Sequence, residues 1–153
     1  MRFQRFQRFQ WFSGFAVSAI LLGFCVAGVA QSRAVTHIDS EKVAAALAKG
    51  GPLAATKDFT VAGTHRNGPG QVEIHDHETD ILYITEGQAT FVTGGTIVGG
   101  KQTAPGQTRG TDIKGGQTTT LKKGDVVTIP AGVPHWFKDV PSMISYLTIK
   151  VIK

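Results

Sequence analysis

Cysteine is almost absent from this chain of 153 residues, and the one cysteine present, Cys25, lies in an apolar N-terminal run. The rest of the chain therefore can form no disulfide, carries no thiolate nucleophile and cannot build a cysteine-ligated zinc site. Any metal ion bound there must be held by nitrogen and oxygen ligands.

Charge is also scarce, because only 18% of the residues are Asp, Glu, Lys or Arg. The formal net charge is +5, and Arg2, Arg5 and Arg8 contribute three of these charges, so the chain beyond residue 30 carries +2. A nucleic-acid-binding protein needs a clustered basic face, which this balance does not supply. We therefore exclude a nucleic-acid partner.

Long apolar runs are missing except between Trp11 and Ala30, where 20 consecutive residues carry no charge. A basic start, an apolar centre and a small-residue end are typical of a secretory signal peptide, predicted here over residues 1–30. The run is also just long enough to be an uncleaved membrane anchor. Basic residues before such a run stay in the cytoplasm, so both alternatives predict a periplasmic or secreted protein.

Helical patterns are rare beyond this segment, and one is found at residues 41–49. Asp39 or Ser40 is a suitable N-cap for it, and the run Gly50-Gly51-Pro52 would end it. We predict a short helix that packs on the body of the protein, within an N-terminal segment over residues 31–56.

Short strands separated by Gly, Pro and Asn clusters are predicted from Lys57 onward. The expected strands cover residues 57–65, 71–77, 80–86, 88–93, 117–122, 125–129 and 143–152. Strands of this length and spacing predict one all-β domain, a sandwich or barrel, over residues 57–153. Residues 99–116, with six glycines and Pro105, interrupt the pattern. We expect them to form a mobile lid or a disordered loop.

Two histidines separated by one residue, His75 and His77, precede the apolar run Ile81–Ile84. In an extended strand, side chains alternate between faces, so both rings would point to the same side, with Cα atoms roughly 6.5–7 Å apart. Two imidazole nitrogens at that spacing can bind one metal ion. Taken alone, such a pair is more typical of ordinary strand histidines.

A third histidine, His135, follows a turn far along the chain. Pro130 and Gly132 define this turn, between a strand over residues 125–129 and a second strand that begins at His135. In a small closed barrel, a histidine from a neighbouring strand can complete a three-nitrogen metal site.

The two stretches together resemble the paired motifs of the cupin superfamily. The second cupin motif, G-x5-P-x-G-x2-H-x3-N, is matched by Gly124, Pro130, Gly132 and His135, with Asp139 at the Asn position. The combined pattern covers residues 57–152 or so and implies a cupin-type double-stranded β-helix, which is a jelly-roll barrel.

The first cupin motif, G-x5-H-x-H-x3,4-E-x6-G, is matched by His75, His77 and Gly87, and its Glu position falls on Asp80. Only two residues separate His77 from Asp80, fewer than in the family pattern. The resemblance implies one bound divalent transition metal (Fe, Mn, Zn, Ni or Cu). The implied metal ligands are His75, His77, His135 and Asp80, with Glu78 as the substitute for Asp80.

An exported cupin with such a metal is expected to be an enzyme for a small oxygenated molecule, of the dioxygenase, isomerase or lyase type. The alternative is a non-catalytic cupin that binds a small ligand such as a sugar or a carboxylate. No catalytic residue, substrate or reaction follows from the sequence. A homodimer is implied by analogy with other cupins, and a membrane contact is expected only if the N-terminal segment stays uncleaved.

Overall fold

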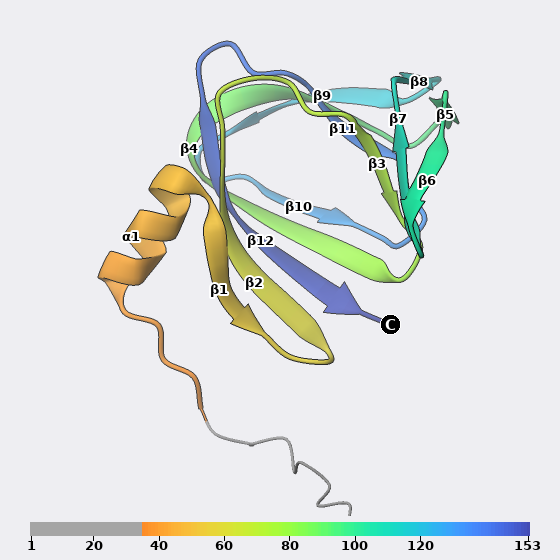
Figure 1. Cartoon of the computed structure of the whole chain (residues 1–153). Helices are drawn as coiled ribbons and strands as arrows, with labels where there is room; N and C mark the ends of the chain where they lie inside the picture. The colour runs from red at the N-terminus through yellow and green to blue at the C-terminus, as the bar shows by residue number, and fades with distance from the viewer. Residues whose placement is uncertain (1–34) are drawn as a thin grey trace, which may run out of the picture. The chain divides into compact units, whose positions relative to one another are not determined.

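Antiparallel strands build most of the protein, as the strand pattern from Lys57 onward predicts. The structure, a computed structural model, describes residues 35–153 (Figure 1). The expected signal peptide, residues 1–30, lies outside the described residues. Within residues 35–153, no helix is long and apolar enough to cross a membrane.

Helix α1 (Ser40–Lys49) begins and ends where its capping residues predict. The carboxylate of Asp39, the N-cap, accepts a hydrogen bond of 2.8 Å from the backbone N–H of Lys42. Gly50 ends the helix, and its φ of 75° is a conformation that glycine adopts readily. The predicted helix is thereby confirmed, with Asp39 as its cap.

Twelve strands follow α1 in the described part of the chain. They are β1 (Gly51–Ala55), β2 (Phe59–Arg66), β3 (Val72–His75), β4 (Glu78–Thr93), β5 (Thr96–Val98), β6 (Lys101–Ala104), β7 (Gln107–Gly110), β8 (Asp112–Lys114), β9 (Gln117–Lys122), β10 (Val126–Ile129), β11 (His135–Asp139) and β12 (Ile144–Ile152). The strands expected at residues 80–86 and 88–93 are one continuous strand, β4. The strand expected to begin at His135 is confirmed as β11.

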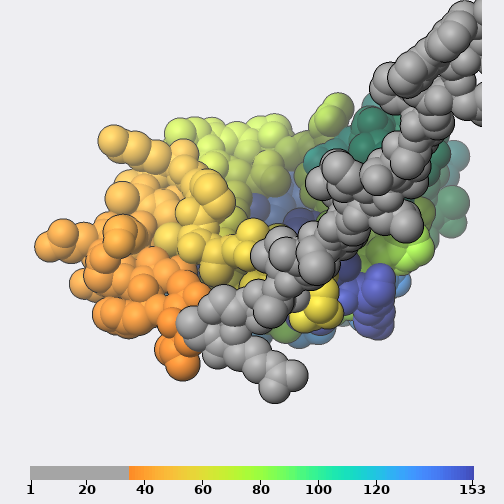
Figure 2. Space-filling model, turned by 60° about the horizontal axis from the view of Figure 1, so that its bottom comes forward, coloured from red at the N-terminus to blue at the C-terminus, as the bar shows by residue number. Residues whose placement is uncertain are grey.

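Residues 99–116 are not the disordered loop that their composition suggested, and the alternative of a mobile lid stays a prediction. They contain β6, β7 and β8. β6 and β7 form a hairpin, β7 pairs with β3, and β8 pairs with β5 in a separate two-stranded sheet. The prediction of disorder was wrong because strand pairing orders this glycine-rich segment, and no local pattern encodes the pairing of β7 with the distant β3. Figures 1 and 2 place this segment (teal) at the end of the domain opposite α1 (orange).

Strand β4 joins the two halves of the main sheet (Figure 1). Its first part, up to Gly87, pairs with β12 and β10, and its second part, from Gln88, pairs with β11 and β9. The path through the sheet is β1-β2-β12-β4-β11-β3-β7-β6, with β9 and β10 also beside β4. One strand that serves both halves brings the two sequence stretches with the histidines into the same interior.

Apolar side chains from both halves meet in one core. Its buried members are Leu82, Ile84, Ala89, Phe91, Leu121, Ile129, Phe137, Val140, Ile144 and Tyr146. Phe137 lies between Phe91 and Tyr146, with ring centroids 4.7 Å and 5.0 Å away. Trp136, on the opposite face of β11, packs instead against a second, smaller cluster. Successive side chains of β11 therefore lie on opposite faces of the sheet.

Gly87 marks the change of β4 from one half of the sheet to the other, and a side chain has no room there. Its φ of 75° is left-handed, and a Cβ atom would overlap the backbone carbonyl of Met143. Gly124 also has a positive φ, of 94°, but no atom lies within 4 Å of a Cβ placed there. A substitution at Gly124 would therefore strain the backbone alone, whereas a substitution at Gly87 would add a steric overlap.

We expect Gly87→Ala to lower the free energy of unfolding by about 2–4 kcal/mol, and Gly124→Ala by about 1 kcal/mol. Both variants strain the backbone, and the first also pushes a methyl group into the β12 side of the barrel. Urea unfolding followed by circular dichroism measures both values. Equal losses in the two variants would contradict the overlap with Met143.

Candidate metal centre

Polar side chains gather on the inward faces of four strands, because every second residue of a strand points to the same side. β3 contributes Glu73 and His75, β4 contributes Asp80, β11 contributes His135, and β12 contributes Lys150. Strand register pairs His135 with Glu73 and Lys150 with Asp80. Residues far apart in the sequence are thereby brought to one point.

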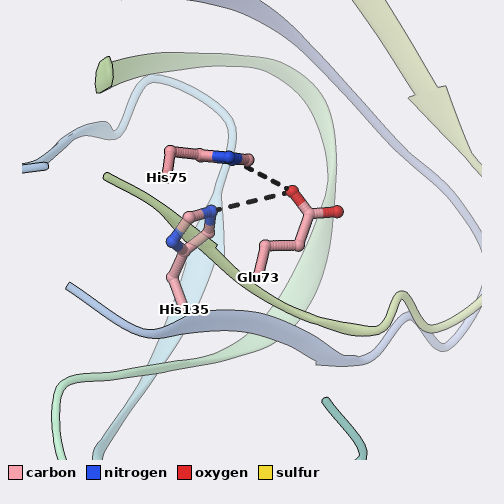
Figure 3. Close-up of side chains that lie close together, drawn as sticks. All are labelled: Glu73, His75 and His135. Atoms are coloured by element: carbon pink, nitrogen blue, oxygen red, sulfur yellow. Dashed lines mark ion pairs between the residues drawn. The ribbon is translucent and has the colours of Figure 1, made fainter. Parts of the chain in front are cut away.

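His75 and His135 lie next to each other, each 5% exposed, with ring centroids 5.1 Å apart. Their Nε2 atoms face the same carboxylate oxygen of Glu73, at 3.3 Å from His75 and 3.8 Å from His135 (Figure 3). A carboxylate oxygen of Asp80, also buried, lies 3.6 Å and 3.8 Å from the same two nitrogens. Four ligand atoms thus converge from three strands.

Hydrogen bonds at Nδ1 orient both histidine rings. Nδ1 of His75 donates to the side-chain oxygen of Gln107 at 2.5 Å, and Nδ1 of His135 donates to the backbone carbonyl of Val133 at 3.1 Å. In a neutral ring whose Nδ1 donates, Nε2 carries the lone pair. Nε2 of His75 is buried and has no hydrogen-bond partner in the described residues. Metal-binding histidines are commonly oriented in this way, with the other nitrogen donating to a carbonyl oxygen.

Lys150 binds the two carboxylates at the start of β4. Its Nζ donates hydrogen bonds to Glu78 at 2.8 Å and to both oxygens of Asp80 at 2.9 and 3.2 Å. Burial by itself would raise the pKa of Glu78, but the hydrogen bond and the positive charge of Lys150 outweigh burial and lower this pKa. Glu78 is therefore ionised at neutral pH.

Two arginine side chains lie near the carboxylate of Glu73. Arg109 lies opposite Glu73 in the register of β3 and β7 and forms an ion pair with it. Arg66 lies 4.0 Å from the same carboxylate. The negatively charged residues of the cluster are Glu73, Glu78 and Asp80, and its positively charged residues are Arg66, Arg109 and Lys150. With neutral histidines, their formal charges balance.

A cavity of about 150 Å³ adjoins the cluster, and Glu73, Asp80, His135 and Lys150 form part of its wall. This volume holds several water molecules or a small ligand. A molecule in the cavity would therefore lie beside the converging nitrogen and oxygen atoms.

His77 lies apart from this cluster. β3 ends at His75, and residues 76–77 form the turn into β4. The expectation of an extended segment over residues 71–77 was wrong at its end, because the turn stops the alternation that would align His77 with His75. His77 is exposed. Within residues 35–153 two groups of ligand atoms converge, and neither includes His77: Glu73, His75 and His135 form one, and His75, Glu78 and Asp80 form the other. A ligand role for His77 stays a prediction.

Sequence reasoning did not select the basic residues of the site or Gln107. Gln107 and Arg109 lie in the segment expected to be a lid or loop. Alternation along residues 143–152 was the one available signal for Lys150, because it places this residue on the same face as Tyr146. Glu73 likewise lies two residues before His75, so alternation places both side chains on the same face of β3.

Burial lowers the pKa of His135 to about 4. In the unfolded chain the same ring takes up a proton below its ordinary pKa of 6.5. Between these two pH values the unfolded state binds more protons than the folded state, so stability rises with pH. The stabilising contribution is complete above about pH 6.5 and is lost as the pH falls towards 4.

For the metal-free protein we expect this ring to account for a loss of up to about 3 kcal/mol of unfolding free energy between pH 7 and pH 4. Urea unfolding in the presence of EDTA, measured across this range for the wild type and for His135→Gln, isolates the contribution. The variant should show a shallower pH dependence. Identical slopes in the two proteins would contradict a buried, neutral His135.

One family model matches most of the chain. The model is described as Cupin, and its match covers residues 29–147. No curated protein sequence matches the chain.

Solved structures match at low identity. A protein from Bacillus halodurans is 16% identical with a TM-score of 0.49, and the match covers 67% of this chain and 68% of that one. A Klebsiella pneumoniae protein with a double-stranded β-helix domain is 18% identical with a TM-score of 0.47, covering 80% and 91%. The Streptomyces nucleoside dehydratase Pac13 is 10% identical with a TM-score of 0.46, covering 65% and 63%. At these values the similarity carries no argument about function.

Proposed function

The chain belongs to the cupin family, and we propose that its interior cluster binds one divalent transition metal and presents a small oxygen-containing molecule to it as a metalloenzyme. The observation that best supports this proposal is the buried, unpartnered Nε2 of His75 beside Nε2 of His135. A buried acceptor without a partner is costly unless a ligand satisfies it.

The ligand atoms present fit a transition metal. Glu73, His75 and His135 supply two nitrogen ligands and one oxygen ligand within binding range of one another, and Asp80 is the candidate fourth ligand. This mixture suits Fe, Mn, Zn, Ni or Cu, whereas Ca and Mg prefer oxygen ligands alone. A metal ion held there would supply Lewis-acid chemistry and open positions for the oxygen atoms of a substrate.

Residues of the cavity can position a substrate and supply a proton. The hydroxyl of Tyr146 accepts a hydrogen bond of 2.8 Å from Nε of Arg66, which leaves the phenolic proton free to be donated. Burial raises the pKa of Tyr146, so the group stays protonated at neutral pH. Tyr146, on the wall of the cavity, is therefore the candidate proton donor.

The second candidate function is binding of a small ligand without a metal or catalysis. It is favoured by the ion pairs of the cluster, because Lys150 and Arg109 already bind Asp80 and Glu73. A cluster with balanced charges does not require a metal ion for its stability. Metal content of the purified protein and conversion of a bound ligand distinguish the two functions.

We also propose that the protein acts outside the cytoplasm, in the periplasm or after secretion. The support is the basic and then apolar composition of residues 1–30. Fractionation of the producing cells tests this, since recovery of the protein in the cytoplasm alone would contradict export. N-terminal sequencing of the exported protein then distinguishes a cleaved signal peptide from an uncleaved anchor.

We expect the wild type to bind about one equivalent of metal, and His75→Gln and His135→Gln to bind it at least about 100-fold more weakly, because each loses one ligand. Elemental analysis and competition with a chelator measure these affinities. His65→Gln is the matched control, because His65 bonds to Ser145 and Asn67 outside the cluster.

The same measurement on His77→Gln decides between ligand sets. Unchanged metal binding would support the set of Glu73, His75 and His135. A loss as large as that of His75→Gln would instead support the three histidines that the sequence motif implies. Absence of metal from the wild type under all loading conditions would contradict the proposed function.

Lys150 and a metal ion are expected to compete for Asp80. In the metal-free protein, Lys150→Gln leaves the buried Asp80 and the partly buried Glu78 without their partner and should lower the free energy of unfolding by about 2–3 kcal/mol. A metal ion can replace the lost charge, so metal should raise the melting temperature of this variant more than that of the wild type.

Thermal unfolding with and without metal measures the difference. Lys57→Gln is the control, because Lys57 pairs only with the exposed Asp58 within the described residues. Equal metal-induced shifts in wild type and Lys150→Gln would contradict the competition and favour the metal-free binding function.

A further inference from the structure

Arg66 is the cation of the cavity that no carboxylate binds closely. Its guanidinium makes one hydrogen bond within residues 35–153, from Nε to the hydroxyl of Tyr146. The one carboxylate within 4.0 Å there belongs to Glu73, which already pairs with Arg109. The terminal N–H groups of Arg66 are therefore available to a ligand.

The guanidinium of Arg66 is also held in a defined plane. Its Cζ lies 5.0 Å from the centroid of the Phe137 ring, a cation–π contact. Gly70 makes room for it, since a Cβ atom at that position would lie 2.9 Å from Nη1 of Arg66. A guanidinium fixed in orientation presents parallel N–H groups, the geometry that matches the two oxygens of a carboxylate.

Other hydrogen-bond donors line the same cavity. Tyr146 has its phenolic proton to donate, and the hydroxyls of Thr64 and Thr148 share a single hydrogen bond of 3.0 Å, which leaves one further proton. These side chains belong to β2 and β12, whose register places Tyr146 opposite Thr64. The acceptors of the wall, Glu73 and Asp80, are already bound by cations. A wall with spare donors suits a ligand that only accepts hydrogen bonds.

The charge balance of the cluster also favours a negatively charged ligand. The acids and bases of the cluster cancel, so a bound divalent metal would leave two positive charges inside the barrel. Uncompensated charge in a low-dielectric interior is costly. A negatively charged ligand removes part of this cost, whereas a neutral sugar does not.

We propose that the cavity binds a small carboxylate, whose oxygens are held by Arg66 and Tyr146 beside the metal centre. The inference rests on the proposed metal function, because it assigns the ligand class of that site. The cavity of about 150 Å³ admits a molecule of roughly two to four carbons.

Calorimetric titration of the metal-loaded full chain with glycolate and with glycolamide tests the inference. The two probes have nearly the same size, and only glycolate is charged. We expect glycolate to bind at least about tenfold more tightly, because hydrogen bonds to a charged group are the stronger ones. Tighter binding of inorganic phosphate or of glucose than of glycolate would overturn the assignment to carboxylates.

Two variants identify the residues that bind the carboxylate. Arg66→Gln should weaken glycolate binding at least about tenfold and leave the metal content unchanged. Tyr146→Phe keeps the ring and should weaken glycolate binding about threefold, so it decides the question if Arg66→Gln does not fold. Lys57→Gln removes one exposed positive charge and is the matched control, with glycolate affinity equal to that of the wild type.

The outcomes separate this inference from the proposed function. Metal content is measured before the titration, and a protein without metal overturns the proposed function together with the charge argument. A metal-loaded protein that binds glycolate and glycolamide equally overturns the carboxylate inference alone. Undiminished glycolate binding by both Arg66→Gln and Tyr146→Phe overturns it as well.

Discussion

Charge buried inside an apolar barrel must be compensated, and this requirement organises the interior of the protein. Each carboxylate of the cluster has a cationic neighbour, and Lys150 serves two of them through hydrogen bonds of 2.8 and 2.9 Å. A carboxylate left alone there would cost several kcal/mol of stability. His135 is neutral for the same reason, since burial opposes its protonation. The site is therefore a cluster of balanced formal charges around two buried imidazole rings.

Within residues 35–153, β4 is the one strand that pairs in both halves of the main sheet, and this makes the cluster possible. Its first part carries Asp80 beside Lys150 of β12, and its second part aligns β11, which carries His135. Gly87 lies between the two parts, with a backbone conformation that other residues rarely adopt. The position of the site thus depends on one change of direction in the backbone, at some distance from the ligands.

The charges of the cluster also connect the proposed metal ion with the proposed carboxylate ligand. With its ion pairs complete, the cluster is neutral, so a divalent ion creates the positive excess that an anion would offset. Arg66, stacked on Phe137 and bonded to Tyr146, links the aromatic core to the polar cavity. The core and the proposed ligand site therefore share residues, and we expect a substitution of Phe137 to affect both.

Membership of the cupin family, predicted from the motifs around His75 and His135, is confirmed by the match over residues 29–147. The all-β fold and the helix capped by Asp39 are confirmed as well. These features could be predicted because alternation, turn residues and helix caps are local properties of a sequence. The strands within residues 99–116 could not, since their pairing partners lie elsewhere in the chain.

For the site, the sequence alone determined that His75 and His135 are candidate ligands from two separate strands. Only the tertiary structure decided that Glu73 and Lys150 join them, and that the chain turns before His77. Lys150 and Asp80 are 70 residues apart, and their contact depends on the register between β12 and β4. Register is set by the packing of the whole barrel, so no short stretch of sequence encodes it.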